Sequence, residues 1–184
     1  MILDAAGIAA LYRSHGHVVL RRARGLLGSE ADAQEVLQEI FTALVKAPDA
    51  VRSVGSMVGW LYQATTHHCL NHLRRARTSA RVLQLHVGPV TPSAGGPRGE
   101  AASEVRRLLA LLPDDVATAV VYHHLDGMSN AEVAELLGCS RRQVGYLHER
   151  AQGLWNRAEQ SARTSNSPFL PGLPASPPSG STGG

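Results

Sequence analysis

Several features that would place a protein in a class at once are missing from this sequence. The two cysteines, Cys69 and Cys139, are too few and too far apart for a disulfide framework or a CxxC metal site. No apolar run approaches the ~18 to 20 residues that span a bilayer, and no basic stretch followed by an apolar run opens the chain. Strand-like alternation is too short to predict a sheet. We therefore expect a cytoplasmic protein without membrane insertion, built from helices.

Lysine is nearly absent as well: Lys46 is the only lysine among 18 basic residues, and the others are arginines. The net charge is only +3, so the placement of the charges is more informative than their sum. Four arginines follow one another without an intervening acid: Arg74, Arg75, Arg77 and Arg81. A separate stripe is acidic: Asp32, Glu35 and Glu39. Charge segregated in this way predicts two unlike partners.

The apolar spacing predicts three helices in the first half of the chain, over residues 5–27, 30–46 and 57–81. Gly28 ends the first helix, and Ser29 is the expected N-cap of the second. The first helix is expected to bury Ile8, Leu11, Tyr12, Val19, Ala23 and Leu26. The second is expected to bury Val36, Leu37, Ile40, Phe41 and Leu44. The inward-facing side of the third is expected to carry Tyr62, Cys69, Leu70, Leu73 and Ala76.

Composition divides the chain into two helical domains and two flexible segments. Residues 86–100 are rich in glycine and proline and predict a flexible linker between a domain at 1–85 and a domain at 101–163. In the second domain, short helices are expected at 101–112 and 114–125, separated by Pro113. Residues 164–184 carry no charge and consist mostly of Ser, Pro and Gly, which predicts a disordered tail.

Two capping boxes give residues 129–163 the strongest local signal. Ser129 with Glu132 and Ser140 with Gln143 both fit the S-x-x-E/Q pattern, so two helices are expected to start on either side of Gly138. This is the pattern of a helix-turn-helix, whose second helix would bury Val144, Leu147, Ala151 and Leu154. The side chains left projecting toward a DNA major groove are Arg141, Arg142, Gln143 and Tyr146. An ordinary helical hairpin is the alternative.

The helix at 57–81 combines residue types that suit unpaired DNA. Arginines neutralise phosphates, amides and imidazoles bond exposed base edges, and an aromatic ring stacks on an unpaired base. The residues concerned are Trp60, Gln63, His67, Asn71, Arg74 and Arg75. Arginines that merely complement the dipole of a helix C-terminus are the alternative. The acidic stripe also has two interpretations: it binds a basic protein partner, or it is a solvated helix face.

The sequence offers no catalytic candidate and no cofactor site. It contains no Gly-rich phosphate loop, nucleophile elbow or HExxH motif. His68 and His72 have the i, i+4 spacing of a helical zinc site, but no carboxylate or cysteine nearby in the sequence completes the set. We therefore expect neither an enzyme nor a bound metal.

Taken in order, these segments resemble a known family. They read D-A-Q-E-x-x-Q-E-x-F, then W-L-Y-Q-A-T-T-H-H-C-L-N-H-L-R-R, then L-L-P-D-D, then D-G-M-S-N-A-E-V-A-E-L-L-G-C-S before the last helix. The set is similar to bacterial RNA polymerase sigma factors of the sigma-70 family, in the extracytoplasmic-function (ECF) class, which keeps only regions 2 and 4. The resemblance spans about residues 8 to 160 and implies an all-α fold with a role in transcription initiation.

The resemblance also implies a role for each surface. Region 2 would dock on the β′ clamp helices of core RNA polymerase through Asp32, Glu35, Gln38 and Glu39. A flipped base of the minus-10 element would enter the loop formed by Arg52, Ser53, Val54, Gly55 and Ser56, while the helix at 57–81 holds the opened strand. Region 4, beside the β flap, would read the minus-35 duplex of promoter DNA through Ser140, Arg141, Arg142, Gln143, Tyr146 and Arg150. An anti-sigma factor, where one exists, would cover the same surfaces.

Some positions depart from the family pattern, and rival functions stay open. Gly145, Tyr146 and Leu147 stand where relatives commonly carry a basic residue and a small polar one, so fewer phosphate contacts are available. The first rival is a stand-alone helix-turn-helix regulator that binds operator DNA by itself. The second is a histidine-rich helical metalloenzyme.

Overall fold

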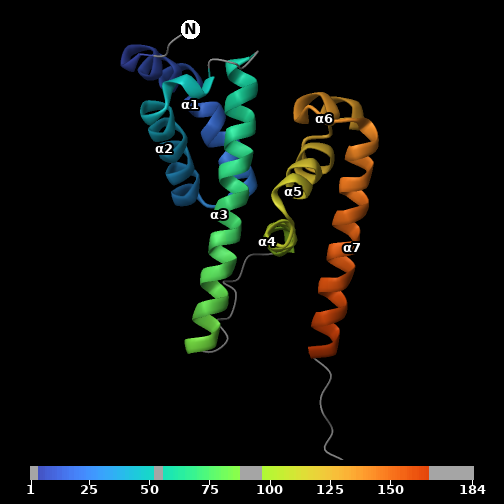
Figure 1. The fold of residues 1–184 in the computed structure, drawn as a ribbon. Helices are drawn as coiled ribbons and strands as arrows, with labels where there is room; N and C mark the ends of the chain where they lie inside the picture. Colours follow the sequence, from blue (N-terminus) through green and yellow to red (C-terminus); the bar gives the residue numbers. More distant parts are fainter. Residues whose placement is uncertain (1–3, 52–55, 88–96, 166–184) are drawn as a thin grey trace, which may run out of the picture.

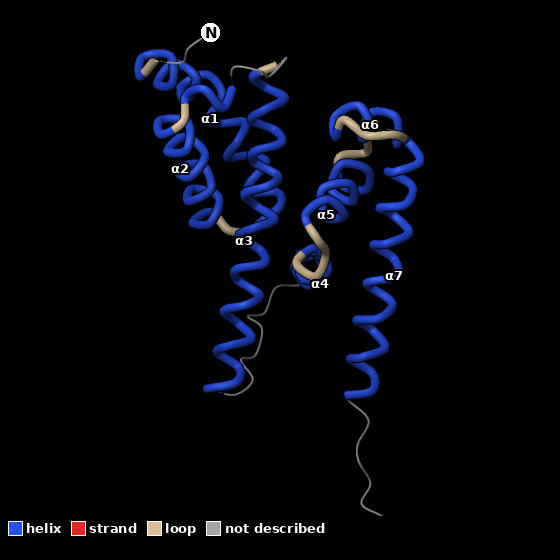
Figure 2. Tube along the Cα trace, in the orientation of Figure 1, coloured by secondary structure: helices blue, strands red, loops and turns tan. Residues whose placement is uncertain are grey.

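The computed structural model describes residues 4–51, 56–87 and 97–165, and within these ranges it contains helices and turns but no strand (Figure 2). The first helical unit comprises α1 (Ala5–Leu27), α2 (Glu30–Lys46), the 3-10 turn η1 (Pro48–Val51) and α3 (Met57–Val87). The second comprises α4 (Pro97–Leu109), α5 (Asp114–Val120), the π-helical turn η2 (Val121–Leu125), α6 (Asn130–Leu137) and α7 (Arg141–Ser165). Figure 1 shows the two units side by side. No helix in the described ranges has the length and apolarity of a membrane span.

Short-range capping explains where the first helices begin and end. The Asp4 carboxylate accepts a hydrogen bond from the Gly7 amide at 2.7 Å and starts α1. Gly28 ends that helix in the left-handed conformation at φ 69°, which a glycine adopts without strain. Ser29 Oγ then accepts a hydrogen bond from the Asp32 amide at 3.3 Å and starts α2. The predicted bounds of both helices are confirmed.

The core of the first unit matches most of the predicted buried residues, with two corrections. Tyr12 is 48% exposed, although its ring packs edge-on against Phe41 at 5.0 Å between centroids. Ala76 is exposed, one turn beyond His72, which already lies beside Asp32 in the first turn of α2. As a whole, α3 runs on beyond α2 (Figure 1). The predictions also missed Thr65 and Thr66, whose buried hydroxyls donate to backbone carbonyls one turn earlier at 2.6 and 2.9 Å.

The second unit contains the predicted helix-turn-helix. Ser129 and Glu132 form a complete capping box at the start of α6, and Gly138 makes the turn at φ 64°. Val144, Leu147 and Ala151 of α7 are buried as expected, whereas Leu154 is only partly buried against the core. The predicted helix at 114–125 is shorter as an α-helix, because α5 passes at Val121 into the π-helical turn η2. The helix predicted at 101–112 is α4, which begins at Pro97 and ends at Leu109.

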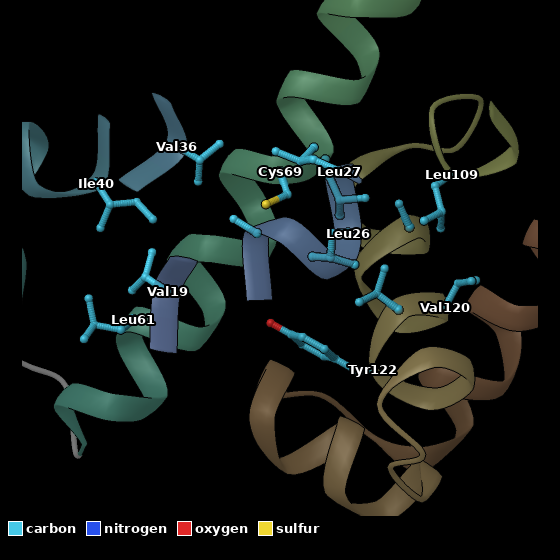
Figure 3. Packing of buried hydrophobic residues seen from close by; sticks show 14 of the residues in the cluster. Val19, Leu26, Leu27, Val36, Ile40, Leu61, Cys69, Leu109, Val120 and Tyr122 are labelled. Carbon is cyan, nitrogen blue, oxygen red and sulfur yellow. The ribbon is translucent and has the colours of Figure 1, made fainter. Parts of the chain in front are cut away.

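The two units share one continuous cluster of buried apolar side chains. Figure 3 shows Leu26 and Leu27 of α1 between the core of the first unit and Leu109, Val120 and Tyr122 of the second. Helices α3 and α4 extend into the predicted linker, whose positions 88–96 lie outside the described residues, as do positions 166–184 of the predicted tail.

Candidate nucleic-acid and polymerase interfaces

The acidic face of α2 is partly paired with basic side chains of α3. Glu39 Oε2 lies 2.8 Å from His68 Nδ1, and Glu39 Oε1 lies 3.3 Å from an Arg75 guanidinium nitrogen. Burial alone would raise the pKa of Glu39, but these two neighbours lower it overall, so the carboxylate stays ionised. Asp32 Oδ1 is 3.5 Å from His72 Nε2. The face is therefore held against α3 at two points.

The other two members of the predicted polymerase-binding set, Glu35 and Gln38, are exposed on α2. Both are spaced on the same side of the helix as the paired acids. An incoming basic surface can reach them without displacing a contact that α3 makes. They are the part of the acidic face best placed to meet a partner.

The same region contains the one group of metal-binding side chains with suitable spacing among the described residues. Ligand atoms of Asp32, Glu35 and His72 lie within 4.8 Å of one another. No carboxylate completes a metal site with His68 and His72 along the sequence, but folding brings two carboxylates close to His72. Carboxylate and imidazole donors suit several divalent ions, but Glu35 is exposed, and Asp32 and His72 are only partly buried.

Two of the predicted minus-10 residues, Gln63 and Arg74, bond to the second helical unit. Gln63 Nε2 donates to the carbonyl of Leu136 at 3.1 Å. Arg74 Nε donates to the carbonyl of Leu112 at 3.2 Å, and the same guanidinium pairs with Asp114. Burial lowers the pKa of Arg74. Both side chains thus have partners on α5, α6 and the turn before α5.

Of the predicted minus-10 residues farther along α3, His67 and Arg75 are exposed and Asn71 is half-buried. Exposed His67 lies 2.9 Å from Asn71, Nε2 to Nδ2. Partial burial, then neighbouring His68 and Arg74, lower the pKa of His67, so its imidazole is neutral at pH 7 and able to accept as well as donate. Arg75 is exposed, and its guanidinium also pairs with the Glu39 carboxylate at 3.3 Å.

Trp60 and Ser56 lie at the start of α3. Trp60 is half-buried and packs against the core. Ser56 Oγ accepts a hydrogen bond from the Gly59 amide at 3.3 Å and so caps the helix. The other predicted loop residues, Arg52, Ser53, Val54 and Gly55, lie outside the described residues.

The predicted recognition helix presents its polar side chains to solvent. Ser140 Oγ accepts a hydrogen bond from the Gln143 amide at 3.1 Å at the start of α7. Arg141, Arg142 and Gln143 are exposed, and Tyr146 is 56% exposed. Arg150 differs from them, because its guanidinium lies 3.3 Å from the Asp115 carboxylate.

Sequence reasoning missed two clusters formed by residues distant in the chain. Arg22 of α1 reaches Asp126, which follows η2, and the side chains are only 12% and 17% exposed. His123, His124 and His148 gather with ring centroids 4.7 to 5.3 Å apart. No periodic signal connects these positions, although the paired histidines at 123 and 124 were visible.

The fold defines an all-α protein that joins a helical bundle to a capped helix-turn-helix. Two family models match it in sequence order: Sigma-70 region 2 over residues 11–79 and Sigma-70, region 4 over residues 102–151. The chain belongs to the sigma-70 family of RNA polymerase sigma factors and is of the ECF type. The predicted family and the predicted all-α fold are confirmed.

Curated relatives carry the same family name. The chain is 29% identical over 141 residues to the ECF RNA polymerase sigma factor SigM of Mycobacterium tuberculosis, covering 77% of this chain and 71% of the relative. It is 27% identical over 121 residues to the ECF RNA polymerase sigma-E factor of Escherichia coli, covering 59% and 63%. A solved structure, CnrH in complex with the cytosolic domain of CnrY, is similar with a TM-score of 0.48 and 22% identity, covering 86% of this chain and 90% of that chain.

Proposed function

We propose that this ECF sigma factor contacts core RNA polymerase through α2, the opened minus-10 strand through α3 and the minus-35 duplex through α7. The observation that carries the proposal is the order of two Sigma-70 regions on two helical units, 11–79 and then 102–151. A stand-alone operator-binding regulator has no need of the first region. The chain itself performs no catalysis and acts in the cytoplasm, where core polymerase supplies the chemistry.

The polymerase contact is proposed for Asp32, Glu35, Gln38 and Glu39. Acids on one helix side repel one another by a few tenths of a kcal/mol per pair, and a basic partner such as the β′ clamp helices reverses the sign of that term. Exposed Glu35 and Gln38 meet the partner directly in this proposal, while Glu39 and Asp32 contribute charge from their pairs with α3.

The minus-10 contact is proposed for α3 and the loop before it. The flipped base enters the loop at residues 52–56, Trp60 provides a ring for stacking, and Gln63, His67 and Asn71 provide polar groups for base edges. Arg74 and Arg75 neutralise phosphates at the far end. Only single-stranded DNA offers unstacked bases to such a helix.

The minus-35 contact is proposed for α7. Ser140 lies just before α7, and the first turn carries Arg141, Arg142 and Gln143, the position from which recognition helices reach base edges in the major groove. Tyr146 and Arg150 extend the surface by one and two turns. Arg150 must exchange Asp115 for a phosphate, which makes its contribution smaller.

Each of these surfaces is small, so the free protein is expected to bind DNA weakly. With a net charge of only +3, it makes few of the phosphate contacts that dominate non-specific affinity. Core polymerase fixes the two units at a separation that lets both promoter elements be bound at once, and the second contact then becomes intramolecular. An anti-sigma factor covering α2 and the DNA-binding faces is the expected form of control.

Run-off transcription from a promoter library tests the proposal. Purified core enzyme should start transcripts from a subset of promoters only when the protein is added. Duplex binding without core polymerase and without any new transcripts would favour the stand-alone regulator. Stoichiometric zinc or iron after purification would favour the metalloenzyme.

A further inference from the structure

Asp32 and Glu35 on α2 and His72 on α3 form a mixed set of metal-binding side chains between two helices. Their ligand atoms lie within 4.8 Å of one another. Asp32 Oδ1 and His72 Nε2 are 3.5 Å apart, which is longer than an ordinary N–H···O hydrogen bond. It is close to the ~3.4 Å that separates two ligand atoms on a tetrahedral ion with bonds of ~2.1 Å. The spacing therefore suits an ion between the side chains better than a direct contact.

Two of these side chains lack a close partner. Among the residues that the structure describes, Glu35 has no hydrogen bond or ion pair, and His72 has only the 3.5 Å contact to Asp32. The His72 side chain is nevertheless only 18% exposed. An imidazole with so little solvent access and no close partner costs free energy, and coordination of an ion would offset that cost.

The backbone around the set is fixed before any ion binds. Ser29 Oγ accepts a hydrogen bond from the Asp32 amide at 3.3 Å, so Asp32 stands at a capped helix start. Glu39 of α2 pairs with His68 of α3 at 2.8 Å. This second link between the helices lies two turns from Asp32 and one turn from His72. Ligands that rigid helices hold in place lose little freedom when an ion binds.

The donor set indicates which ions would bind. It offers two carboxylates and one imidazole but no thiolate, a combination that suits Zn²⁺, Co²⁺ or Ni²⁺. Mg²⁺ and Ca²⁺ prefer oxygen ligands throughout, so the imidazole of His72 disfavours them. Three protein ligands leave the remaining coordination positions to water. The ion is therefore expected to exchange with the solution, unlike the resident metal of a metalloenzyme.

An ion at this position would change the face that is proposed to meet the polymerase. Asp32 and Glu35 belong to that face, and the two positive charges of the ion offset their two negative charges. Glu35 and Gln38 also line a groove of about 430 Å³ between α2 and α3, which leaves the position open to ions from solvent. His72 belongs to none of the surfaces assigned in the proposed function. Replacing it therefore separates metal binding from polymerase binding.

We propose that Asp32, Glu35 and His72 bind a divalent transition-metal ion of the Zn²⁺ class, and that the bound ion competes with core polymerase for the acidic face of α2. The competition rests on the proposed function, whereas the metal site does not. Because linkage is reciprocal, the ion lowers the affinity for the polymerase by the same factor by which the polymerase lowers the affinity for the ion.

Isothermal titration calorimetry with ZnCl₂ tests the site on the free full-length chain at pH 7.5, after dialysis against EDTA and then against chelator-free buffer. His72→Gln removes the imidazole, and Glu35→Gln removes a carboxylate at an exposed position where the fold is not at risk. His17→Gln is the matched control, because it makes the same change at an exposed histidine on α1. MgCl₂ replaces ZnCl₂ in a parallel titration.

The wild type and His17→Gln should bind Zn²⁺ with equal affinity. His72→Gln and Glu35→Gln should each weaken binding by about tenfold or more, since even the loss of a group that only orients a ligand costs ~10–100-fold. Mg²⁺ should bind at least about tenfold more weakly than Zn²⁺. Equal Zn²⁺ binding by the wild type and both ligand variants, no Zn²⁺ binding at all, or Mg²⁺ binding as tight as Zn²⁺ would overturn the inference. If circular dichroism shows that His72→Gln has lost helix content, Glu35→Gln decides.

Biolayer interferometry on immobilised core polymerase tests the competition. Saturating ZnCl₂ should weaken wild-type binding by about threefold to tenfold, whereas His72→Gln should bind equally with and without the ion. That variant also controls for an effect of zinc on the polymerase itself. A bound ion that leaves the wild-type affinity unchanged, or that weakens both proteins alike, would overturn the competition.

The two measurements separate this inference from the proposed function. A chain that binds Zn²⁺ through His72 but ignores core polymerase in the absence of the ion defeats the proposed function and leaves the metal site standing. A chain that binds the polymerase but not Zn²⁺ defeats only the metal site and the competition.

Discussion

Glu39 on α2 and His68 on α3 lie 2.8 Å apart, carboxylate oxygen to imidazole nitrogen, so part of the proposed polymerase-binding face is already paired inside the protein. Arg75 approaches the same carboxylate at 3.3 Å. The four residues proposed for polymerase binding are therefore not equivalent. Glu35 is exposed and is free to contact the polymerase. Glu39 also stabilises the packing of α2 on α3 through its pairs with His68 and Arg75.

Glu35→Lys should weaken binding to core polymerase by about tenfold or more, because a like charge placed against a basic surface is costly. Its melting temperature should stay close to that of the wild type, since the side chain is exposed. Glu39→Lys should lose affinity and melt earlier, because it places a cation beside His68 and Arg75. Biolayer interferometry on immobilised core enzyme and circular dichroism measure the two effects.

Glu159→Lys is the control for the Glu35→Lys and Glu39→Lys variants, since it makes the same charge change at an exposed position on α7. Equal core binding by wild type and Glu35→Lys would remove the physical basis for assigning the acidic face to the polymerase.

Replacing both Arg141 and Arg142 by alanine should lower run-off transcription from promoters with a minus-35 element by about tenfold or more, because a good arginine contact to a base is worth ~1–3 kcal/mol. Core binding should not change, as both side chains project into solvent from the first turn of α7. Arg163→Ala removes an exposed arginine near the end of the same helix and serves as control. Loss of core binding in the double variant would indicate damage to the fold instead.

Replacing either of two glycines near the turn by alanine should change the free energy of unfolding, in opposite directions at the two positions. At Gly145, inside α7, an added methyl group meets no atom within 4 Å, so Gly145→Ala should stabilise the fold by about 0.5–1 kcal/mol. At Gly138 the space is equally open, but φ is +64°, so Gly138→Ala should destabilise it by about 1–2 kcal/mol. Urea unfolding followed at 222 nm gives both values, and a loss of stability in Gly145→Ala would contradict the reasoning.

Acidification should destabilise the second unit through its histidine cluster. Burial and, next, the neighbouring imidazoles lower the pKa of His148 and His124 below the ordinary value of 6.5. The unfolded chain then takes up protons before the folded one, so the free energy of unfolding is highest above pH 6.5 and falls as the pH drops below it. Urea midpoints at pH 7.5 and 5.5 measure the difference.

His148→Phe tests whether the cluster causes that difference. Both ring nitrogens of His148 are buried without a hydrogen-bond partner, so an aromatic ring without them should stabilise the fold by about 1 kcal/mol and flatten the pH dependence. His17→Gln, at an exposed position on α1, should leave the pH dependence as it is. An equally steep pH dependence in His148→Phe would show that other groups are responsible.

The helices were predictable because their signals are short-range. Asp4, Ser29 and Ser129 cap helices that start within a residue of them, and Gly28 and Gly138 end helices at positive φ. The apolar spacing of α2 also located its buried side, as all five predicted residues are buried. The apolar spacing of α3 overstated the core at Ala76, which is exposed.

The candidate interfaces were only partly predictable. The residue types on α3 and α7 suggested DNA binding, but nothing in the spacing placed Gln63 against Leu136 or Arg74 against Asp114. Likewise, no local spacing connects the acidic stripe of α2 with its partners, because His68, His72 and Arg75 lie on α3.

The amino-acid sequence by itself determined the helices, their caps, the helix-turn-helix and the order of the two sigma regions, because each depends on residues within a few turns of one another. Only the tertiary structure decided which charges find partners. Arg22 and Asp126 are 104 positions apart, and contacts at that separation depend on how two units pack rather than on any local period.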